Sequence, residues 1–410
     1  MSFIADLHIH SKYSRATSPQ MTLENIHAGA QIKGISVVGT GDFTHPLWFA
    51  GIKKKLETAQ AGLFNLKKKY RNEKDVFQSC RREVRFMLSA EISCIYSKNG
   101  RVRKIHALVL APDIAAAEEI NRQLRKIGNI HSDGRPILGL DAKKLLQICL
   151  NASPGVCFIP AHIWTPHFSV FGSNSGFDSL DECFEERTPQ IFALETGLSS
   201  DPKMNWRISQ LDAYTLVSHS DAHSPQKLGR EADIFDGEIS YPAMMHSLKT
   251  KEKFLGTLEF FPEEGKYHLD GHRPCAMRLT PAETKKYGYR CPKCSKKVTV
   301  GVMHRVEELA DRPEGFIPPA APPFSSIIPL KEILAEYAGV GAASKKVGFM
   351  YNQIISELGN ELDLLLNVPL DHIQRIASRE LADRIKRLRN KDVSVSPGYD
   401  GVFGTISVRG

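Results

Sequence analysis

Seven apolar stretches of strand length each carry a side chain that can bind a metal ion. The stretches cover residues 3–10, 35–42, 84–95, 105–111, 156–163, 191–197 and 214–221. The candidate ligands among their histidine and acidic residues are, in chain order, His8, His10, Asp42, Glu91, His106, His162, Glu195, Asp221 and, just beyond the last stretch, His223. A single buried histidine or glutamate on a strand is usually structural, but seven such strands in succession predict a shared metal cluster.

The segments between most of these stretches are helical or irregular in pattern, which predicts a parallel α/β fold. In such folds the ligand site lies at the carboxyl ends of the strands, whether the sheet is open or closed into a barrel. His8 and His10 fit this arrangement, because residues two apart on a strand project from the same face. Two exposed histidines near a terminus are the alternative for this pair taken alone.

Length and composition limit the class of protein. At 410 residues the chain is long enough for more than one domain. It contains no apolar run of membrane-spanning length, and the first residues enter a strand pattern directly, so we expect a cytoplasmic protein without a membrane partner. Five scattered cysteines are expected to be reduced thiols: Cys80, Cys94, Cys149, Cys157 and Cys183.

A basic segment lies between the second and third strands. Residues 51–86 contain eleven lysines and arginines against four acidic residues, and include the run Lys67, Lys68 and Lys69. This density of positive charge indicates a polyanionic partner, for which these three lysines are candidate contacts. A solvated helix face is the alternative.

A second metal motif follows residue 262. His272 and Cys275 are separated by two residues, fifteen residues follow, and Cys291 and Cys294 form a second pair with the same spacing. This pattern predicts a structural zinc site. His268 and His304 compete with His272 for the fourth ligand position.

The last part of the chain changes character twice. Six prolines between positions 313 and 329 predict a stiff extended linker, and residues 330–338, 344–358 and 371–389 have helical periodicity. We therefore expect four regions: a metal-binding domain over 1–262 with the basic insertion 51–86, a zinc module over 263–310, a linker over 311–330 and a helical domain over 331–410.

The ordered set of strand residues resembles the polymerase and histidinol phosphatase (PHP) family of metallophosphoesterases. The resemblance implies a distorted seven-stranded β/α barrel that holds two or three divalent ions, such as zinc, manganese or magnesium. One ion would be held by His8, His10, Glu91 and Asp221, which would be the catalytic residues. Glu91 would bridge to a second ion, held by His106 and His162.

The residues that bind a third ion in many members of that family are less well matched in this sequence. Here the usual positions read Ser14-Arg15-Ala16 and Asp42-Phe43, so a third ion would rest on Asp42 and His223, with His45 as a further candidate. The resemblance implies phosphoester hydrolysis. Arg15, Lys227 and Arg230 follow strand ends and are candidate phosphate contacts, or ordinary surface charges.

The succession of metallophosphoesterase barrel, basic insertion, zinc module and helical domain resembles the endonuclease Q family. The local strings at residues 39–46 and 220–225 support this resemblance. It implies a DNA repair enzyme that cuts 5′ of deoxyinosine, deoxyuridine or an abasic site, after extruding the nucleotide. Trp48 and Trp164 would then be stacking surfaces, or buried packing residues. A small-molecule phosphatase and a non-catalytic nucleic-acid-binding protein are the alternatives.

Overall fold

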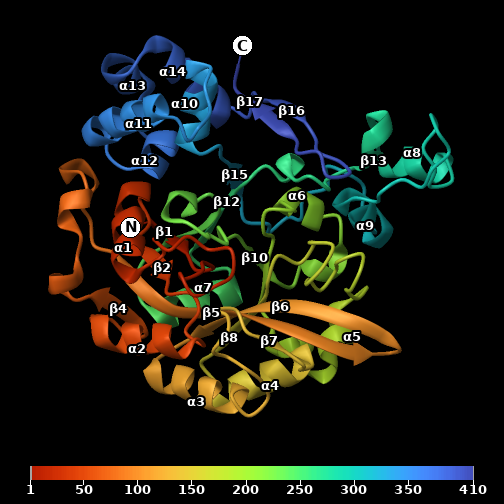
Figure 1. Cartoon of the computed structure of the whole chain (residues 1–410), viewed down its shortest axis with the longest axis horizontal. Coiled ribbons are helices and arrows are strands. Elements are labelled where there is room, and N and C mark those ends of the chain that lie inside the picture. Colours follow the sequence, from red (N-terminus) through yellow and green to blue (C-terminus); the bar gives the residue numbers. More distant parts are fainter. Residues whose placement is uncertain (1, 410) are drawn as a thin grey trace.

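A computed structural model describes residues 2–409 and shows a mixed α/β body, a helical C-terminal lobe and a small arm (Figure 1). The main sheet of the body has eleven strands. Eight of them form one path, in the spatial order β15 (Phe324–Ser326), β12 (Phe254–Glu259), β11 (Ala232–Asp236), β1 (Ser2–Asp6), β2 (Val37–Gly39), β5 (Arg85–Lys98), β4 (Leu63–Leu66) and β3 (Leu56–Thr58). The strands attached through β5 are β6 (Arg101–Ala111), β7 (Ile137–Leu138) and β8 (Cys157–Pro160). A separate parallel pair is formed by β9 (Ala193–Glu195) and β10 (Thr215–Val217).

All seven predicted strands are present, but the prediction of a parallel sheet is only partly right. Strands β1, β2 and β5 are parallel, whereas β6 is antiparallel to both β5 and β8. The reason is a tight hairpin in which Asn99 and Gly100 have φ angles of 54° and 71°, the left-handed conformation that two-residue hairpin turns require. Glu91 and His106 therefore lie within long paired strands and not at strand ends.

Backbone contacts beyond the strand ends join the remaining segments into a ring. Ile9 forms a parallel bridge with Ala222, which connects the end of β1 to the segment after β10. On the other side, the Ile163 N–H donates to Glu195 O at 3.0 Å and connects the end of β8 to β9. The segments that carry the predicted ligands consequently surround one region.

Helices cover this body (Figure 1). Their bounds are α1 (Leu23–Lys33), α2 (Pro46–Lys55), α3 (Ile114–Leu124), α4 (Ala142–Ala152), α5 (Leu180–Phe184), α6 (Pro202–Asn205) and α7 (Tyr241–Thr250). Helix α1 is capped at its N-terminus by Thr22, whose side chain accepts the Asn25 N–H, and at its C-terminus by Gly34 in the left-handed conformation. Helices α3 and α4 pack against each other and against β6. Within residues 2–409, no helix combines the length and the apolar character needed to cross a membrane.

The basic segment 51–86 contains the end of helix α2, a β-hairpin and three short turns, and is not a single solvent-exposed helix. After α2 it forms the β3–β4 hairpin, which extends the sheet beside β5, and then three short 3₁₀ turns (Lys68–Tyr70, Glu73–Asp75 and Gln78–Cys80). The last turn packs against the C-terminal lobe, where Ser79 Oγ donates to Ile355 O at 2.9 Å. Val76 and Cys80 are buried in the core of that lobe. Part of this segment therefore holds two regions of the molecule together.

The C-terminal lobe contains α10 (Leu330–Ala338), α11 (Lys345–Leu358), α12 (Glu361–Leu366), α13 (Leu370–Ile376) and α14 (Arg379–Arg389). The predicted helix over 371–389 is two helices, because Ser378 caps α14 by accepting the Leu381 N–H. A buried ion pair between Lys33 and Glu361, 2.6 Å apart, attaches the lobe to α1. The proline-rich segment 311–330 lies along the body, and its strand β15 pairs with β12.

The arm that projects to the right in Figure 1 has little apolar core. It contains the antiparallel strands β13 (Asp270–His272) and β14 (Met277–Leu279), followed by α8 (Pro281–Lys286), and α9 (Val302–Leu309) connects it to the body. Its buried apolar side chains are Leu279, Cys291 and Val298. A last hairpin, β16 (Ser394–Ser396) and β17 (Thr405–Ser407), lies between arm and lobe in Figure 1.

Candidate active site and zinc module

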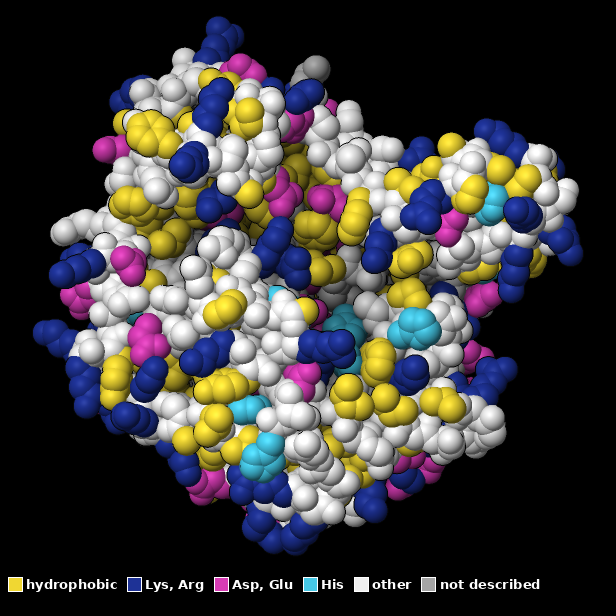
Figure 2. Space-filling model, in the orientation of Figure 1, with side chains coloured by type: hydrophobic (Ala, Val, Ile, Leu, Met, Phe, Trp, Pro, Cys, Tyr) yellow, Lys and Arg dark blue, Asp and Glu magenta, His cyan; other side chains and the backbone are white. Residues whose placement is uncertain are grey.

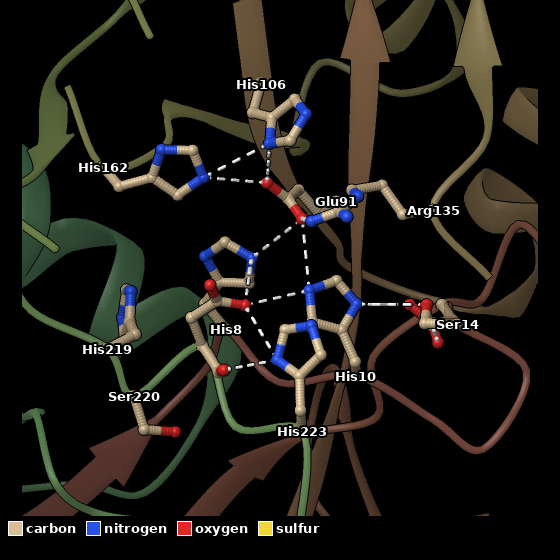
Figure 3. A network of polar contacts seen from close by, with 12 residues as sticks. His8, His10, Ser14, Glu91, His106, Arg135, His162, His219, Ser220 and His223 are labelled. Atoms are coloured by element: carbon tan, nitrogen blue, oxygen red, sulfur yellow. Dashed lines mark hydrogen bonds and ion pairs between the residues drawn. The ribbon is translucent and has the colours of Figure 1, made fainter. Parts of the chain in front are cut away.

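Four side chains from separate segments converge at the centre of the ring. The Nε2 atom of His10 lies 3.1 Å from Glu91 Oε2 and 3.0 Å from Asp221 Oδ1. The Nε2 atom of His8 lies 3.5 Å from the same Glu91 oxygen and 3.9 Å from the same Asp221 oxygen. Figure 3 shows these nitrogen and oxygen atoms facing one another. His8 and His10 are fully buried, and the Asp221 side chain retains 28% exposure.

Three of the four ligand atoms of this group lack hydrogen-bond partners in the described part of the chain. Within residues 2–409, His8 Nε2, His10 Nε2 and Asp221 Oδ1 are buried and make no hydrogen bond. Buried polar atoms are nearly always satisfied, so three unsatisfied atoms that face one point require an explanation. Two imidazoles and two carboxylates are a suitable donor set for a divalent ion such as zinc or manganese. These residues therefore fit a metal ion.

A second group shares Glu91 with the first. Its other oxygen, Oε1, lies 2.5 Å from His106 Nδ1 and 3.0 Å from His162 Nε2. These two ring nitrogens are 3.3 Å apart. Glu91 thus directs one oxygen into each group, as the predicted bridging ligand would, and both groups have ligand atoms close enough to hold one ion each.

Glu195 fixes the orientation of both groups. Both of its oxygens lie 3.0 Å from His8 Nδ1, and Oε1 also lies 2.8 Å from His219 Nδ1. The His162 backbone N–H donates to Oε2 at 2.8 Å. His219 in turn lies 3.2 Å from Asp233. A carboxylate behind a ligating histidine selects the tautomer and the ring orientation, so Glu195 is a positioning residue.

Asp42 is a positioning residue too, which differs from its predicted place as a third-ion ligand. Its Oδ1 lies 3.1 Å from His10 Nδ1, whereas Glu91 faces the Nε2 atom of the same ring. Its Oδ2 accepts hydrogen bonds from Ser11 N, Ser11 Oγ and Ser14 Oγ. Ser11 and Ser14 therefore surround Asp42 with donors and occupy its lone pairs.

The other two candidates for a third ion are not gathered with Asp42. His223 lies beside His10, with ring centroids 4.5 Å apart, and its Nδ1–H donates to Asp221 O at 2.8 Å. His45 turns away, stacks on Tyr13 and donates its Nε2–H to His131 O. No third group of ligand atoms involving these residues is close enough to hold an ion within residues 2–409.

Arg135 is a site residue that the sequence analysis missed. Its Nη1 lies 2.9 Å from Glu91 Oε2, and Figure 3 shows it reaching Glu91 from the side opposite His162. It comes from a loop between α3 and β7 that has no periodic pattern and no adjacent predicted ligand. No signal in the sequence distinguishes it from the other arginines.

The backbone that presents the ligands is strained at three points. Asp42, His162 and Asp221 have φ angles of 47°, 31° and 46°, a region in which residues other than glycine cost of order 1 kcal/mol or more. The surrounding contacts hold Asp221 in place: Arg230 Nε donates to Ser220 O at 2.7 Å, and Asp6 accepts the Ser220 N–H at 3.0 Å. Such strain is typical of functional sites.

The buried carboxylates and imidazoles of the cluster shift one another's pKa values. Burial opposes the charged form of Glu91, but His106 and His8 outweigh it and hold the pKa of Glu91 well below its ordinary value. Burial also opposes protonation of His8 and His10, yet the neighbouring carboxylates raise the pKa of both rings. Burial lowers the pKa of His106 to about 4. The cluster therefore carries protons that a bound cation would displace.

The predicted phosphate-binding residues lie in three different settings. Arg15 is exposed, and Lys227 pairs with Glu332 of the C-terminal lobe at 3.3 Å. Lys227 and Arg230 line a cavity of about 710 Å³ that body, arm and lobe form together. The run 67–69 is partly bound: Lys67 donates to Lys54 O at 2.8 Å, whereas the two lysines that follow are exposed.

The two tryptophans are packing residues, so their prediction as stacking surfaces is wrong. Trp48 is 4% exposed and donates its indole N–H to Gly41 O at 2.9 Å. Trp164 is 1% exposed and donates to Asn205 Oδ1 at 2.8 Å. Both indole rings are buried and hydrogen-bonded inside the protein, so neither is placed to stack on a nucleotide.

In the arm, the four predicted zinc ligands lie together. His272, Cys275, Cys291 and Cys294 place their ligand atoms within 4.8 Å of one another. His304 is engaged elsewhere, since its Nδ1 lies 2.6 Å from Asp270 and its Nε2 lies 3.3 Å from the Tyr289 hydroxyl. His268 is buried outside this group, where burial lowers its pKa to about 4. Of the three candidates for the fourth ligand, only His272 is placed to serve.

Comparisons with known proteins agree with this geometry. A family model described as the MJ0043 C-terminal domain matches residues 329–392. The chain is 34% identical to uncharacterized protein MJ0043 of Methanocaldococcus jannaschii over 263 residues, which are 62% of this chain but only 31% of the length of that protein.

Two solved structures resemble the chain over its whole length. The first is the lesion-specific endonuclease PfuEndoQ from Pyrococcus furiosus, at 30% identity and a TM-score of 0.86, covering 99% of this chain and 95% of that one. The second is an endonuclease Q complex with a 27-mer duplex substrate that has an abasic lesion at the active site, at 30% identity and a TM-score of 0.84, covering 100% and 97%. The chain belongs to the endonuclease Q family.

Proposed function

We propose that this protein is a metal-dependent endonuclease that hydrolyses the phosphodiester on the 5′ side of a deaminated or abasic nucleotide in DNA. One observation carries the proposal. The buried cluster of His8, His10, Glu91 and Asp221, with its unsatisfied ligand atoms, lies in a chain that matches a lesion-specific endonuclease over 99% of its length. Deoxyinosine, deoxyuridine and abasic sites are the proposed lesions.

The metal sites follow from the donor atoms. His8, His10, Glu91 and Asp221 would hold one divalent ion, and Glu91, His106 and His162 a second. When bound, such ions supply Lewis acidity to a phosphodiester and lower the pKa of the attacking water. Zinc and manganese suit the mixed histidine and carboxylate donors better than magnesium, which prefers oxygen ligands.

The protein contributes rigidity to this chemistry. Glu195 holds His8 and the backbone of His162, and Asp42 holds His10, so the rings keep their orientation without an ion. Arg230 binds the carbonyls of Ser220 and Asp221 and keeps the Asp221 carboxylate at the open edge of the cluster. Groups that are already in place need no reorganisation when charge develops on the phosphate.

We place the DNA in the hollow between body, arm and lobe. Figure 2 shows histidine side chains in this hollow and lysine or arginine side chains on its rim. The cavity of about 710 Å³ adjoins the cluster through Arg230, and Lys227 and Lys266 add positive charge to its walls. A cavity of this volume has room for an extruded nucleotide.

We also propose that the ring of strand segments is a distorted seven-stranded barrel. The bridge between Ile9 and Ala222 and the hydrogen bond from Ile163 to Glu195 support this description. We propose four regions in the same way: a barrel over 1–262, a zinc module over 263–310, a linker over 311–330 and a helical domain over 331–410. The separate apolar core of the helical lobe supports the last boundary.

The test uses four end-labelled 27-mer duplexes that are identical except for one position, which holds deoxyinosine, deoxyuridine, an abasic site or the undamaged base. The protein should cut the damaged strands 5′ of the lesion and leave the undamaged duplex whole, and excess chelator should stop the reaction. Hydrolysis of small phosphomonoesters without DNA cleavage would instead indicate the phosphatase. DNA binding without either activity would indicate a non-catalytic protein.

A further inference from the structure

The loop over residues 131–135 is fixed at the edge of the active site. His45 Nε2 donates to His131 O at 3.0 Å, and Thr44 Oγ1 donates to Gly134 O at 3.1 Å. The Gly134 N–H donates to Tyr13 O at 3.0 Å. Segments after β1 and β2, which carry His8, His10 and Asp42, therefore determine where this loop lies.

Gly134 makes the closest approach. A β-carbon at this position would lie 2.2 Å from Asp42 Oδ2 and 2.4 Å from Ser14 Oγ. The backbone thus fills the space beside Asp42 Oδ2 and Ser14 Oγ. Only glycine permits this approach, and the approach brings the next residue, Arg135, against the metal cluster.

The guanidinium of Arg135 lies at the boundary between the cluster and solvent. Its Nη1 donates to Glu91 Oε2 at 2.9 Å, the oxygen that also faces His8 and His10. The side chain is 25% exposed. Within residues 2–409, its Nε and Nη2 atoms have no hydrogen-bond acceptor. Most of its donors are therefore free to bind an anion that enters the site.

We propose that Arg135 is a catalytic residue that binds a non-bridging oxygen of the scissile phosphate at the solvent-facing edge of the cluster, beside Glu91 Oε2. This inference rests on the proposed function. A guanidinium offers several donors in a rigid plane that matches phosphate, and it stays charged at every working pH. Positioned beside the two proposed ion sites, it stabilises the negative charge that builds up on the phosphate during hydrolysis.

The competing account is purely structural: Arg135 would only neutralise Glu91 and hold it in place. The two accounts differ in what the arginine does for a phosphate. If the role were structural, a substitution would change metal content or thermal stability, and any loss of phosphate affinity would follow from lost metal. If Arg135 contacts phosphate, affinity falls while the metals stay bound.

The test compares the full-length wild-type protein with Arg135→Ala, Arg135→Lys and the control Arg122→Ala, which removes an exposed arginine paired with Glu119 on α3. Three quantities are measured: metal content by mass spectrometry, affinity of the metal-loaded protein for inorganic phosphate by calorimetry, and cleavage of a deoxyinosine duplex. Inorganic phosphate is too small to depend on DNA contacts, so this readout remains informative even if the proposed DNA substrate is wrong.

Arg135→Ala is expected to keep its metals, bind phosphate at least tenfold more weakly and cleave about 10²–10³-fold more slowly, the usual cost of removing one donor to a developing anion. Added guanidinium chloride should restore part of the cleavage. Arg135→Lys should be intermediate, because it keeps the charge and loses the fork. Arg122→Ala should resemble the wild type.

Phosphate affinity within twofold of the wild type in a metal-replete Arg135→Ala protein would overturn the inference. If Arg135→Ala loses metal, the phosphate affinity and metal content of Arg135→Lys test the proposal instead. Weaker phosphate binding with full metal content in Arg135→Lys supports the contact. Unchanged binding in that variant, or loss of metal there too, assigns Arg135 to holding Glu91 and overturns the proposal.

Discussion

The buried cluster of the proposed barrel and the Cys/His cluster of the proposed zinc module are both groups of metal-ligand side chains, but they differ in what surrounds them. The barrel ligands come from several segments of a large core, and His8, His10 and Glu91 are at most 1% exposed. The zinc ligands come from one short stretch whose buried apolar side chains are Leu279, Cys291 and Val298, and Cys294 is exposed. Imidazoles and carboxylates predominate in one, thiols in the other.

This difference indicates which interactions hold the ligand side chains in place in each region. In the proposed barrel, Glu195 and Asp42 hold the histidines by hydrogen bonds that do not involve an ion, so the protein fold organises the site and a bound metal would add chemistry. In the proposed zinc module the apolar core is small, so a bound zinc ion would supply much of the folding free energy. Removing the ligands should therefore have opposite consequences in the two regions.

The largest effect is expected for Cys291→Ser. Loss of the zinc site removes binding free energy on the order of 10 kcal/mol from the module, so residues 270–300 should exchange their amide hydrogens rapidly and one zinc per chain should disappear from mass analysis. Hydrolysis of bis(p-nitrophenyl) phosphate, which reports on the barrel alone, should remain near the wild-type rate. Unchanged zinc content would show that the cysteines are not ligands.

Asp221→Ala should show the reverse pattern. The variant loses a proposed metal ligand, so DNA cleavage should fall by more than the roughly 10–100-fold typical of residues one contact removed from a metal. DNA affinity should change little, because contacts to the phosphate backbone elsewhere supply most of it. Glu252→Ala, which removes a carboxylate that is 73% exposed, is the control. Near-normal cleavage by Asp221→Ala would contradict the assignment of the metal site.

Glu195→Gln tests the positioning role with a smaller change. The amide keeps the size of the side chain but cannot accept from His8, His219 and the His162 N–H together, so metal affinity in the barrel should fall about 10–100-fold. Competition against a chromogenic chelator measures this affinity. The matched control is Glu186→Gln, at a side chain that is 67% exposed. Equal affinity in the Glu195 variant would mean that the rings hold their orientation without it.

Acid should weaken metal binding in the barrel. The raised pKa values of His8 and His10 mean that both rings still carry protons above the ordinary pKa of histidine. An entering ion must displace those protons, so affinity should rise with pH, by about tenfold per pH unit for each proton displaced, until the rings are neutral. Calorimetry in buffers of different ionisation enthalpy counts the protons. Release of no protons near pH 7 would contradict the raised pKa values.

The smallest effect is expected at the basic segment. Replacing Lys67, Lys68 and Lys69 with alanine should reduce the slope of log DNA affinity against log salt concentration by about two. Lys67 already donates to the protein's own Lys54 carbonyl, so two lysines remain, and about one counterion is released per phosphate contact. Hydrolysis of bis(p-nitrophenyl) phosphate should not change. If that activity falls as well, the segment supports the barrel and does not bind DNA.

The residues of the candidate site that the sequence predicts are those whose position follows from local pattern. His8, His10 and His162 follow from alternation and from the rule that ligands gather where strands end, and the His272 to Cys294 spacing needs no tertiary information. Glu91 and His106 lie within strands and not at strand ends, but they still reach the site because β5 and β6 are long enough to cross it. The antiparallel pairing of these strands had a signal in the Asn99-Gly100 turn.

Other features depend on contacts that no local pattern encodes. Asp42 acts behind His10 because two serines supply it with donors, and Arg135 reaches Glu91 because Gly134 packs against Asp42. Trp48 and Trp164 follow strand ends as a stacking residue would, yet their indole N–H groups find acceptors inside the core. Only the fold shows which strand-end residues face the site.

The most direct measurement relates cleavage to the number of ions bound per chain. Divalent zinc is returned stepwise to chelator-treated full-length protein, and the rate of 5′-side cleavage of a deoxyinosine strand is followed together with metal content. Because thiolates favour zinc, the first ion should fill the module without producing cleavage, and the rate should rise only as the second and third ions enter the barrel. Full cleavage at one ion per chain, or none at three, would contradict this account.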